Sequence, residues 1–202
     1  MRASKPFVLG LTGGIGCGKS EAARYLTSLG AAHIDADGIS RALTAPGGEA
    51  LPAIRREFGE RVFASDGSLD RRALAEIVFA DAAAKRRLEG IIHPLVWART
   101  LRMIEETDAS VAVLDVPLLF ESGMDELCGE TWAMSADDAT QIARIRERDG
   151  LSEAQARARI ANQLPMAERN ARATRVIDSA RPIEETRSEL ARLYAELLGR
   201  IG

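Results

Sequence analysis

A glycine-rich run near the start of the chain constrains the fold more than any other feature of the sequence. The letters GGIGCGKS occupy positions 13–20, directly after the apolar segment 7–11 and directly before a helical pattern over 19–29. They fit G-x-x-x-x-G-K-[ST], in which loop and helix N–H groups surround phosphate oxygens. A side chain at the glycines would block that approach. The run therefore predicts a strand, a phosphate-binding loop and a helix, in that order.

This loop is expected to bind the phosphates of ATP. Lys19 supplies a mobile positive charge for the β- and γ-phosphates, and the hydroxyl of Ser20 can bind Mg²⁺. Glu21 stands where small hydroxyl residues are frequent in P-loop kinases, so its carboxylate must point away and its contact is expected through the backbone N–H. The expected ATP-binding residues are Gly13, Gly14, Gly16, Cys17, Gly18, Lys19, Ser20 and Glu21.

Short apolar runs alternate with helical patterns along much of the chain. Strands are expected at 7–11, 31–34, 111–116, 131–134 and 175–177. Strands that alternate with helices pair in parallel, so the pattern predicts an α/β fold, a P-loop kinase-type parallel sheet flanked by helices. Between 45 and 108 no strand is expected, and we interpret this block as a helical insertion.

Capping residues indicate where several of the helices begin. Asp70 and Asp81 are predicted N-caps of two helices in the insertion. Pro94 is the expected start of a further helix. Ser152 and Gln155 predict a capping box at the start of a late helix.

Composition and charge exclude several classes of protein. Apolar residues make up 46% and charged residues 28% of the 202 residues, as in soluble globular proteins. The net charge of −3 disfavours a general nucleic-acid coat protein. No window approaches the roughly 18 consecutive apolar residues of a membrane span, and no signal peptide is evident. With only two cysteines, we expect a cytoplasmic protein without nucleic-acid or membrane partners.

A phosphate-binding loop does not say what is done with the nucleotide. The Asn-Lys-x-Asp motif of GTPases and the Leu-Ser-Gly-Gly-Gln signature of transporter ATPases are both absent from the sequence. The segment 35–38 imitates a D-x-x-G switch but lies too close to the loop. A small-molecule kinase remains, whose single domain must hold both donor and acceptor.

Two aspartates after the second expected strand are candidates for the acceptor site. A kinase needs a group that orients the attacking hydroxyl, and in an open α/β sheet it projects from the carboxyl end of a strand. Asp35 and Asp37 would point the same way in an extended segment. Arg41 would share a face with Asp37 if a helix began at Gly38. Alternatively, Asp37 and Gly38 form a turn, or Asp37 only caps the next helix.

A later strand and loop provide further candidates. Asp115 directly follows four apolar residues. A Walker B strand, whose aspartate helps to position Mg²⁺, has this pattern. However, any buried strand can end in aspartate. The segment 116–121 is apolar for a loop and is expected to expose apolar side chains beside the phosphate end of the sheet, which suits an apolar or stacked acceptor. His93 either contacts substrate or is satisfied locally in a loop turn with Pro94.

Arginines are concentrated in a late helical segment. Arg144 and Arg148 share a helix face at i, i+4. Guanidinium groups that close over the γ-phosphate would match its oxygens, and the alternative is an ordinary solvated surface.

Taken together, these motifs resemble the dephospho-coenzyme A kinase family. The resemblance runs from about 7 to 198, and the letters DVPLLFE at 115–121 are its most specific part. The other similar segments are the loop at 11–20, Asp35 to Asp37 with Arg41, His93 with Pro94, and the lid region 141–163. The departures are Cys17 for serine, Glu21 for a hydroxyl residue, Arg169 for lysine and the segment 173–179.

The resemblance implies the last step of coenzyme A synthesis, transfer of the ATP γ-phosphoryl group to the ribose 3′-hydroxyl of dephospho-coenzyme A with Mg²⁺. It implies one domain, residues 1–202, with a core of about 1–45 and 109–202, an acceptor-binding insertion of about 46–108, and a lid of about 140–165. A monomer or weak homo-oligomer is expected.

The resemblance also implies roles for individual residues. The catalytic set is Asp37, Lys19, Arg144 and Arg148; the substrate set is Asp35, Arg41, His93, Leu118 and Glu121; the metal set is Ser20 and Asp115. The competing hypotheses are another small-molecule kinase and a regulatory or scaffold module that binds ATP without transferring phosphate.

Overall fold

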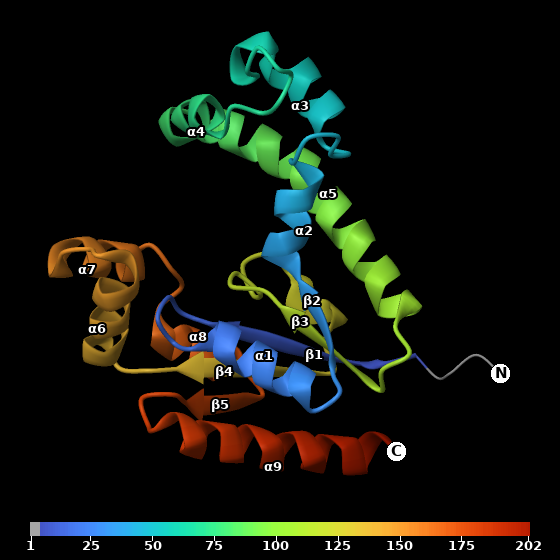
Figure 1. Ribbon diagram of the computed structural model, residues 1–202, viewed down its shortest axis with the longest axis vertical. Helices are drawn as coiled ribbons and strands as arrows, with labels where there is room; N and C mark the ends of the chain where they lie inside the picture. The colour runs from blue at the N-terminus through green and yellow to red at the C-terminus, as the bar shows by residue number, and fades with distance from the viewer. Residues whose placement is uncertain (1–4) are drawn as a thin grey trace. The chain divides into compact units, whose positions relative to one another are not determined.

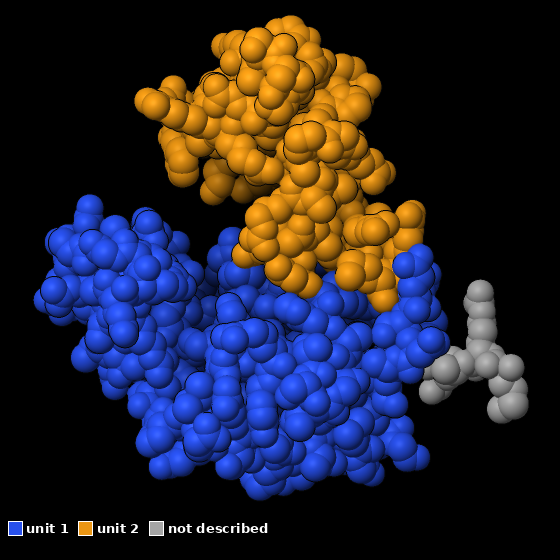
Figure 2. All heavy atoms as spheres, viewed as in Figure 1, with its two compact units in different colours: residues 1–34, 104–202 blue, residues 35–103 orange. Residues whose placement is uncertain are grey.

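The computed structural model describes residues 5–202 and contains two compact units. The first unit joins the chain up to Ile34 with residues 104–202, and the second comprises residues 35–103 (Figure 2). The second unit is thus inserted between two segments of the first.

The first unit is built on a five-stranded sheet (Figure 1). Its strands are β1 (Phe7–Gly13), β2 (Ala32–Asp35), β3 (Val111–Asp115), β4 (Glu130–Ser135) and β5 (Arg175–Asp178), in the spatial order β2-β3-β1-β4-β5. Strand β1 pairs in parallel with β3 and β4, and β4 pairs in parallel with β5. The predicted parallel sheet and its five strands are confirmed.

The main core lies on one face of this sheet. Alternate strand residues point to the same face, and there they are fully buried, as Leu9, Leu11 and Trp132 show. Helices α1 (Lys19–Ser28) and α9 (Ile183–Ile201) cover that face with apolar side chains such as Leu26 and Leu190. Burial of these side chains holds α1, and with it the glycine loop, against the end of β1.

A pair of helices follows β4 in the chain. Helix α6 (Asp138–Asp149) packs on α7 (Glu153–Ala161) through a small cluster that contains Ile145 and Ala156. The predicted capping box is present, because Ser152 and Gln155 each bond the other's backbone. Helix α8 (Met166–Arg172) then leads into β5.

The second unit is helical, as predicted for the insertion. It contains α2 (Ala36–Leu43), α3 (Leu51–Phe58), a 3₁₀ turn at Glu60–Val62, α4 (Arg71–Ala80) and most of α5 (Ala82–Glu106). The carboxylate of Asp70 accepts from the N–H groups of Arg72 and Ala73, and that of Asp81 accepts from Ala83. Both predicted N-caps are therefore confirmed.

The helix start predicted at Pro94 is wrong. Helix α5 runs unbroken for 25 residues with Pro94 inside it. A proline removes one backbone hydrogen bond from a helix interior, and burial of Val96 and Thr100, four residues apart on one face, favours continuing the helix past it. Among residues 5–202, no helix combines the length and apolar character that crossing a membrane requires.

Candidate active site

The glycine loop joins the end of β1 to the first residue of α1. Gly16 and Gly18 have φ values of 80° and 74°, a left-handed backbone that side-chain-bearing residues rarely adopt. The carbonyl of Gly18 accepts the N–H groups of Glu21 and Ala22, both at 3.0 Å, and so begins the helix. The Glu21 N–H, which is expected to contact phosphate, is thus the donor of a hydrogen bond within the first turn of α1.

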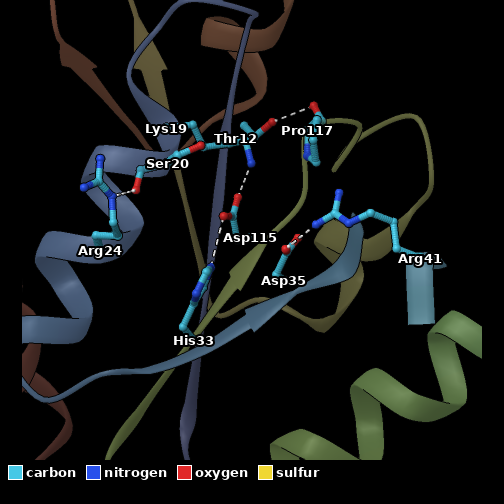
Figure 3. A network of polar contacts seen from close by, with 9 residues as sticks. All are labelled: Thr12, Lys19, Ser20, Arg24, His33, Asp35, Arg41, Asp115 and Pro117. Atoms are coloured by element: carbon cyan, nitrogen blue, oxygen red, sulfur yellow. Dashed lines mark hydrogen bonds and ion pairs between the residues drawn. The ribbon is translucent and has the colours of Figure 1, made fainter. Parts of the chain in front are cut away.

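Lys19 and Asp115 lie together where β1 and β3 end. Lys19 forms an ion pair with one oxygen of Asp115, whose side chain is only 6% exposed. The other carboxylate oxygen lies 3.1 Å from Nε2 of His33, in β2 (Figure 3). Because β3 lies between β1 and β2 in the sheet, it brings these two side chains to one carboxylate. Two predicted site residues are therefore in direct contact.

His33 is a site residue that the sequence reasoning missed. The sequence pattern places it in an expected strand, two residues before Asp35 and near the carboxyl end of β2. That position was the available signal, since ligands of open α/β sheets gather at these strand ends.

The loop after β3 is more buried than its apolar sequence suggested. Leu118 is 49% exposed, as an acceptor contact would need, but Leu119 and Phe120 are buried. The expectation of a generally exposed apolar loop is wrong, because Leu119 packs against Gly10 of β1. Thr12 of β1 donates to the carbonyl of Pro117 at 3.1 Å (Figure 3), which ties this loop to the first strand. Glu121 is exposed.

The two acceptor-site aspartates differ in backbone setting from what we expected. Helix α2 begins at Ala36, so Asp35 occupies the N-cap position and Asp37 lies in the first turn. The two carboxylates therefore do not share one side of an extended segment, since residues two apart in a helix point roughly 200° apart. The alternatives of a turn at Gly38 or a cap at Asp37 are also wrong.

Within the second unit, Arg41 donates to Oδ2 of Asp35 at 2.9 Å (Figure 3). Asp37 is exposed and stands four residues before Arg41 on the same helix. His93 is also exposed, but it lies inside α5, so the proposed loop turn is wrong.

The two arginines of the expected lid make different contacts. Arg144 of α6 donates to the carbonyl of Gly16 at 3.1 Å and to the carbonyl of Ser179 at 2.6 Å. Arg148 instead donates through two nitrogens to Asp149, which also accepts from Arg159 at 2.8 Å. The hydrogen bonds from Arg148 lower the pKa of Asp149. Arg144 thus contacts the glycine loop, whereas Arg148 pairs with its neighbour Asp149, and the bond from Arg159 to Asp149 joins α7 to α6.

Ser179, in a segment that departs from the family pattern, and Gln163, in a segment that matches it, both contact the loop. The hydroxyl of Ser179 donates to the carbonyls of Cys17 and Ser135, at 2.9 and 3.1 Å. The N–H of Ile15 donates to Oε1 of Gln163 at 2.8 Å. Burial raises the pKa of the Cys17 thiol, which keeps the thiol protonated and structural.

A cavity of about 260 Å³ opens beside the loop within the first unit. Its lining combines apolar and polar side chains: Gly18, Glu21, Ala22, Met134, Arg144, Ser179, Arg181, Ile183, Thr186, Arg187 and Leu190. The site therefore places a cavity with a mixed apolar and polar lining directly beside the glycine loop.

A parallel sheet with a glycine loop after its first strand, a lysine in that loop and an aspartate at the end of the neighbouring strand defines a P-loop kinase fold. Residues 7–185 match the dephospho-CoA kinase family. The chain belongs to this family.

Individual relatives agree along most of the chain. The dephospho-CoA kinase of Symbiobacterium thermophilum is 44% identical over 195 residues, covering 95% of this chain and 82% of that protein. Among solved structures, TT1252 from Thermus thermophilus is 34% identical with a TM-score of 0.84, covering 96% of this chain and 99% of that one. The dephospho-CoA kinase from Campylobacter jejuni is 28% identical with a TM-score of 0.70, covering 94% and 96%.

Proposed function

We propose that this protein transfers the γ-phosphoryl group of ATP to the ribose 3′-hydroxyl of dephospho-coenzyme A, the last step of coenzyme A synthesis. The activity follows from membership of the family. The observation that carries it onto this site is the glycine loop with Lys19 held against Asp115 at the neighbouring strand end.

The donor site comprises the loop from Gly13 to Glu21 and the adjoining cavity. Backbone N–H groups and Lys19 bind the β- and γ-phosphates, so Lys19 exchanges its contact with Asp115 for phosphate oxygens. The nucleoside occupies the cavity, where Met134 and Leu190 contact the base. Arg144 and Arg148 act on the phosphates when the helices α6 and α7 close as a lid, which excludes water and limits hydrolysis of ATP.

Ser20 and Asp115 fit a magnesium ion. An exposed hydroxyl at the start of α1 and a carboxylate at the end of β3 are the oxygen donors that Mg²⁺ prefers. Asp115 already has partners on both oxygens, which suits a contact through water. When bound, the ion would neutralise charge on the phosphate oxygens.

Asp37 is the proposed base on the acceptor side. The 3′-hydroxyl gives its proton to the Asp37 carboxylate while its oxygen bonds to the γ-phosphorus. The bond from that phosphorus to the β–γ bridging oxygen breaks, and ADP leaves with the electron pair. Asp35, Arg41, His93, Leu118 and Glu121 are the proposed acceptor contacts, in an insertion of about residues 46–108 and the segments beside it.

We further propose a cytoplasmic monomer or weak homo-oligomer. Both cysteines are free thiols, which suits a reducing compartment.

Turnover against a panel of acceptors tests the function. The purified protein is incubated with ATP, Mg²⁺ and dephospho-coenzyme A, a nucleoside monophosphate or shikimate, and ADP release is followed. Of the three acceptors, we expect only dephospho-coenzyme A to be phosphorylated. Its product should be heavier by one phosphoryl group, carried on the 3′-oxygen. Turnover with a different acceptor would establish another small-molecule kinase, and ATP binding without any turnover would establish a regulatory or scaffold module.

A further inference from the structure

A carboxylate beside a phosphate-binding loop needs a physical explanation. Glu21 directly follows Ser20, the proposed magnesium ligand, and it lines the cavity beside the loop. A triphosphate bound to the loop carries several negative charges, so an unpaired carboxylate at this position would repel it. The positive N-terminal end of helix α1 attracts both the Glu21 carboxylate and a bound phosphate. The carboxylate therefore competes with phosphate for the favourable interaction with the helix dipole.

The structure pairs this carboxylate with an arginine from the far end of the chain. Arg187 of α9 donates through Nε at 3.2 Å and through Nη2 at 2.5 Å to the same Oε1 of Glu21, 166 residues away. The second carboxylate oxygen lies 2.6 Å from Arg24, in the next turn of α1. Both oxygens of Glu21 are therefore engaged by guanidinium groups.

Arg187 is itself held in place. Its Nη1 donates to Glu184 at 3.2 Å, and its guanidinium carbon lies 5.6 Å from the centre of the Tyr25 ring. The side chain of Arg187 is 35% exposed and that of Glu21 is 26% exposed, whereas Arg24 is 75% exposed. Of the two arginines, Arg187 is the less solvated and also lines the cavity, so it is the stronger source of positive charge near a bound nucleotide.

We propose that Arg187 is a positioning residue of the donor site, which holds the Glu21 carboxylate against α9 and neutralises it so that ATP can bind. This inference rests on the proposed donor site. In this chain, Glu21 and Arg187 act together in the place of the small hydroxyl residue expected after the loop serine. Neither side chain needs to touch the reacting atoms.

A double-mutant cycle on ATP binding tests the proposal. The dissociation constant of ATP is measured by calorimetry for the wild type, Arg187→Gln, Glu21→Thr and the double variant. We expect Arg187→Gln alone to weaken ATP binding about 3- to 10-fold, because it leaves a carboxylate with one exposed partner beside the phosphates. We expect the double variant to bind within about twofold of the wild type, since no carboxylate remains to be neutralised, and Glu21→Thr to bind ATP at least as tightly as the wild type, since it keeps the positive charge of Arg187.

A kinetic readout separates this role from a structural one. In the same variants, Arg187→Gln should raise KM for ATP by a similar factor while kcat and KM for the acceptor change less than about twofold. The loss should shrink as salt is raised, because the repulsion is between partly exposed charges. Arg192→Gln is the matched control: Arg192 pairs with Glu196 on the same helix but does not line the cavity. Its ATP binding should be unchanged.

The possible results separate the two proposals. A double variant that binds ATP as weakly as Arg187→Gln would overturn the inference, because Arg187 would then act on the nucleotide or on α9 itself. Unchanged ATP binding in Arg187→Gln would overturn it as well. Because binding is measured without turnover, a protein that fails to phosphorylate dephospho-coenzyme A refutes the proposed function and leaves this test intact.

Discussion

Lys19 and Asp115 form an ion pair although 96 residues separate them in the chain. The pair exists because β1 and β3 are neighbours in register, with Leu11 opposite Asp115. A carboxylate that is nearly buried must be compensated, and His33 assists at the second oxygen. The ion pair thereby holds the ammonium group of Lys19, which is expected to bind phosphate, at the end of β3 before a nucleotide binds.

Lys19→Ala should abolish tight ATP binding and catalysis. We expect an increase of at least about 30-fold in the dissociation constant for ATP and a fall of about 10³-fold in kcat/KM, because the loop loses its mobile charge. The variant should also unfold at lower temperature, since His33 is then the one side-chain partner left to Asp115 among residues 5–202. Calorimetry and thermal unfolding measure the two effects. Lys85→Ala is the control, because Lys85 forms an exposed ion pair with Glu89 on α5. Normal ATP binding by Lys19→Ala would show that phosphate binds elsewhere.

Asp37→Asn should separate chemistry from nucleotide binding. The amide cannot accept the proton of the attacking hydroxyl, so kcat should fall about 10²- to 10⁴-fold while the dissociation constant for ATP stays within a few-fold. Steady-state kinetics with dephospho-coenzyme A gives the first quantity and calorimetry gives the second. Glu76→Gln is the control, because it removes an exposed i, i+4 ion pair with Arg72 in the same unit. It should change neither kcat nor the dissociation constant for ATP. If Asp37→Asn turns over at nearly the normal rate, another group is the base.

Arg144→Lys should lower both the stability of the protein and its affinity for ATP, although the substitution keeps the positive charge. An ammonium group cannot reproduce the guanidinium contacts with both Gly16 and Ser179. We expect a loss of about 1–3 kcal/mol in the free energy of unfolding and ATP binding weaker by about 5- to 10-fold. Denaturant unfolding with and without ATP measures both. Arg157→Lys, whose partner Glu153 lies on the exposed side of α7, is the comparison; equal behaviour of the two variants would show that the loop does not depend on Arg144.

The Asp149 network should make the wild type lose stability in acid. Hydrogen bonds from Arg148 hold the pKa of Asp149 below its ordinary value of 3.8. The carboxylate therefore contributes stability above about pH 3.8, and this contribution is lost as pH falls through the lower, folded-state pKa. The melting temperature of the wild type should exceed that of Asp149→Asn at pH 7, and the gap should close towards pH 3. A gap that is constant over this range would mean that the ionised carboxylate is not the cause.

Local features of the fold were predictable because they depend on neighbours along the chain. The glycine loop, the N-caps at Asp70 and Asp81 and the capping box at Ser152 all involve groups within a few residues of one another. Errors occurred where packing decided the outcome. Helix α5 continues through Pro94, beyond which Val96 and Thr100 are buried.

From its amino acids alone, the chain could be assigned a P-loop, five parallel strands with intervening helices, and a set of candidate site residues. Which of those residues meet was decided by the order of the strands and the docking of the helices. His33 with Asp115, Arg144 with Gly16 and Arg187 with Glu21 lie 82, 128 and 166 residues apart. Contacts over such separations leave no periodic trace in a single sequence, because they form only when burial of the sheet brings distant segments together.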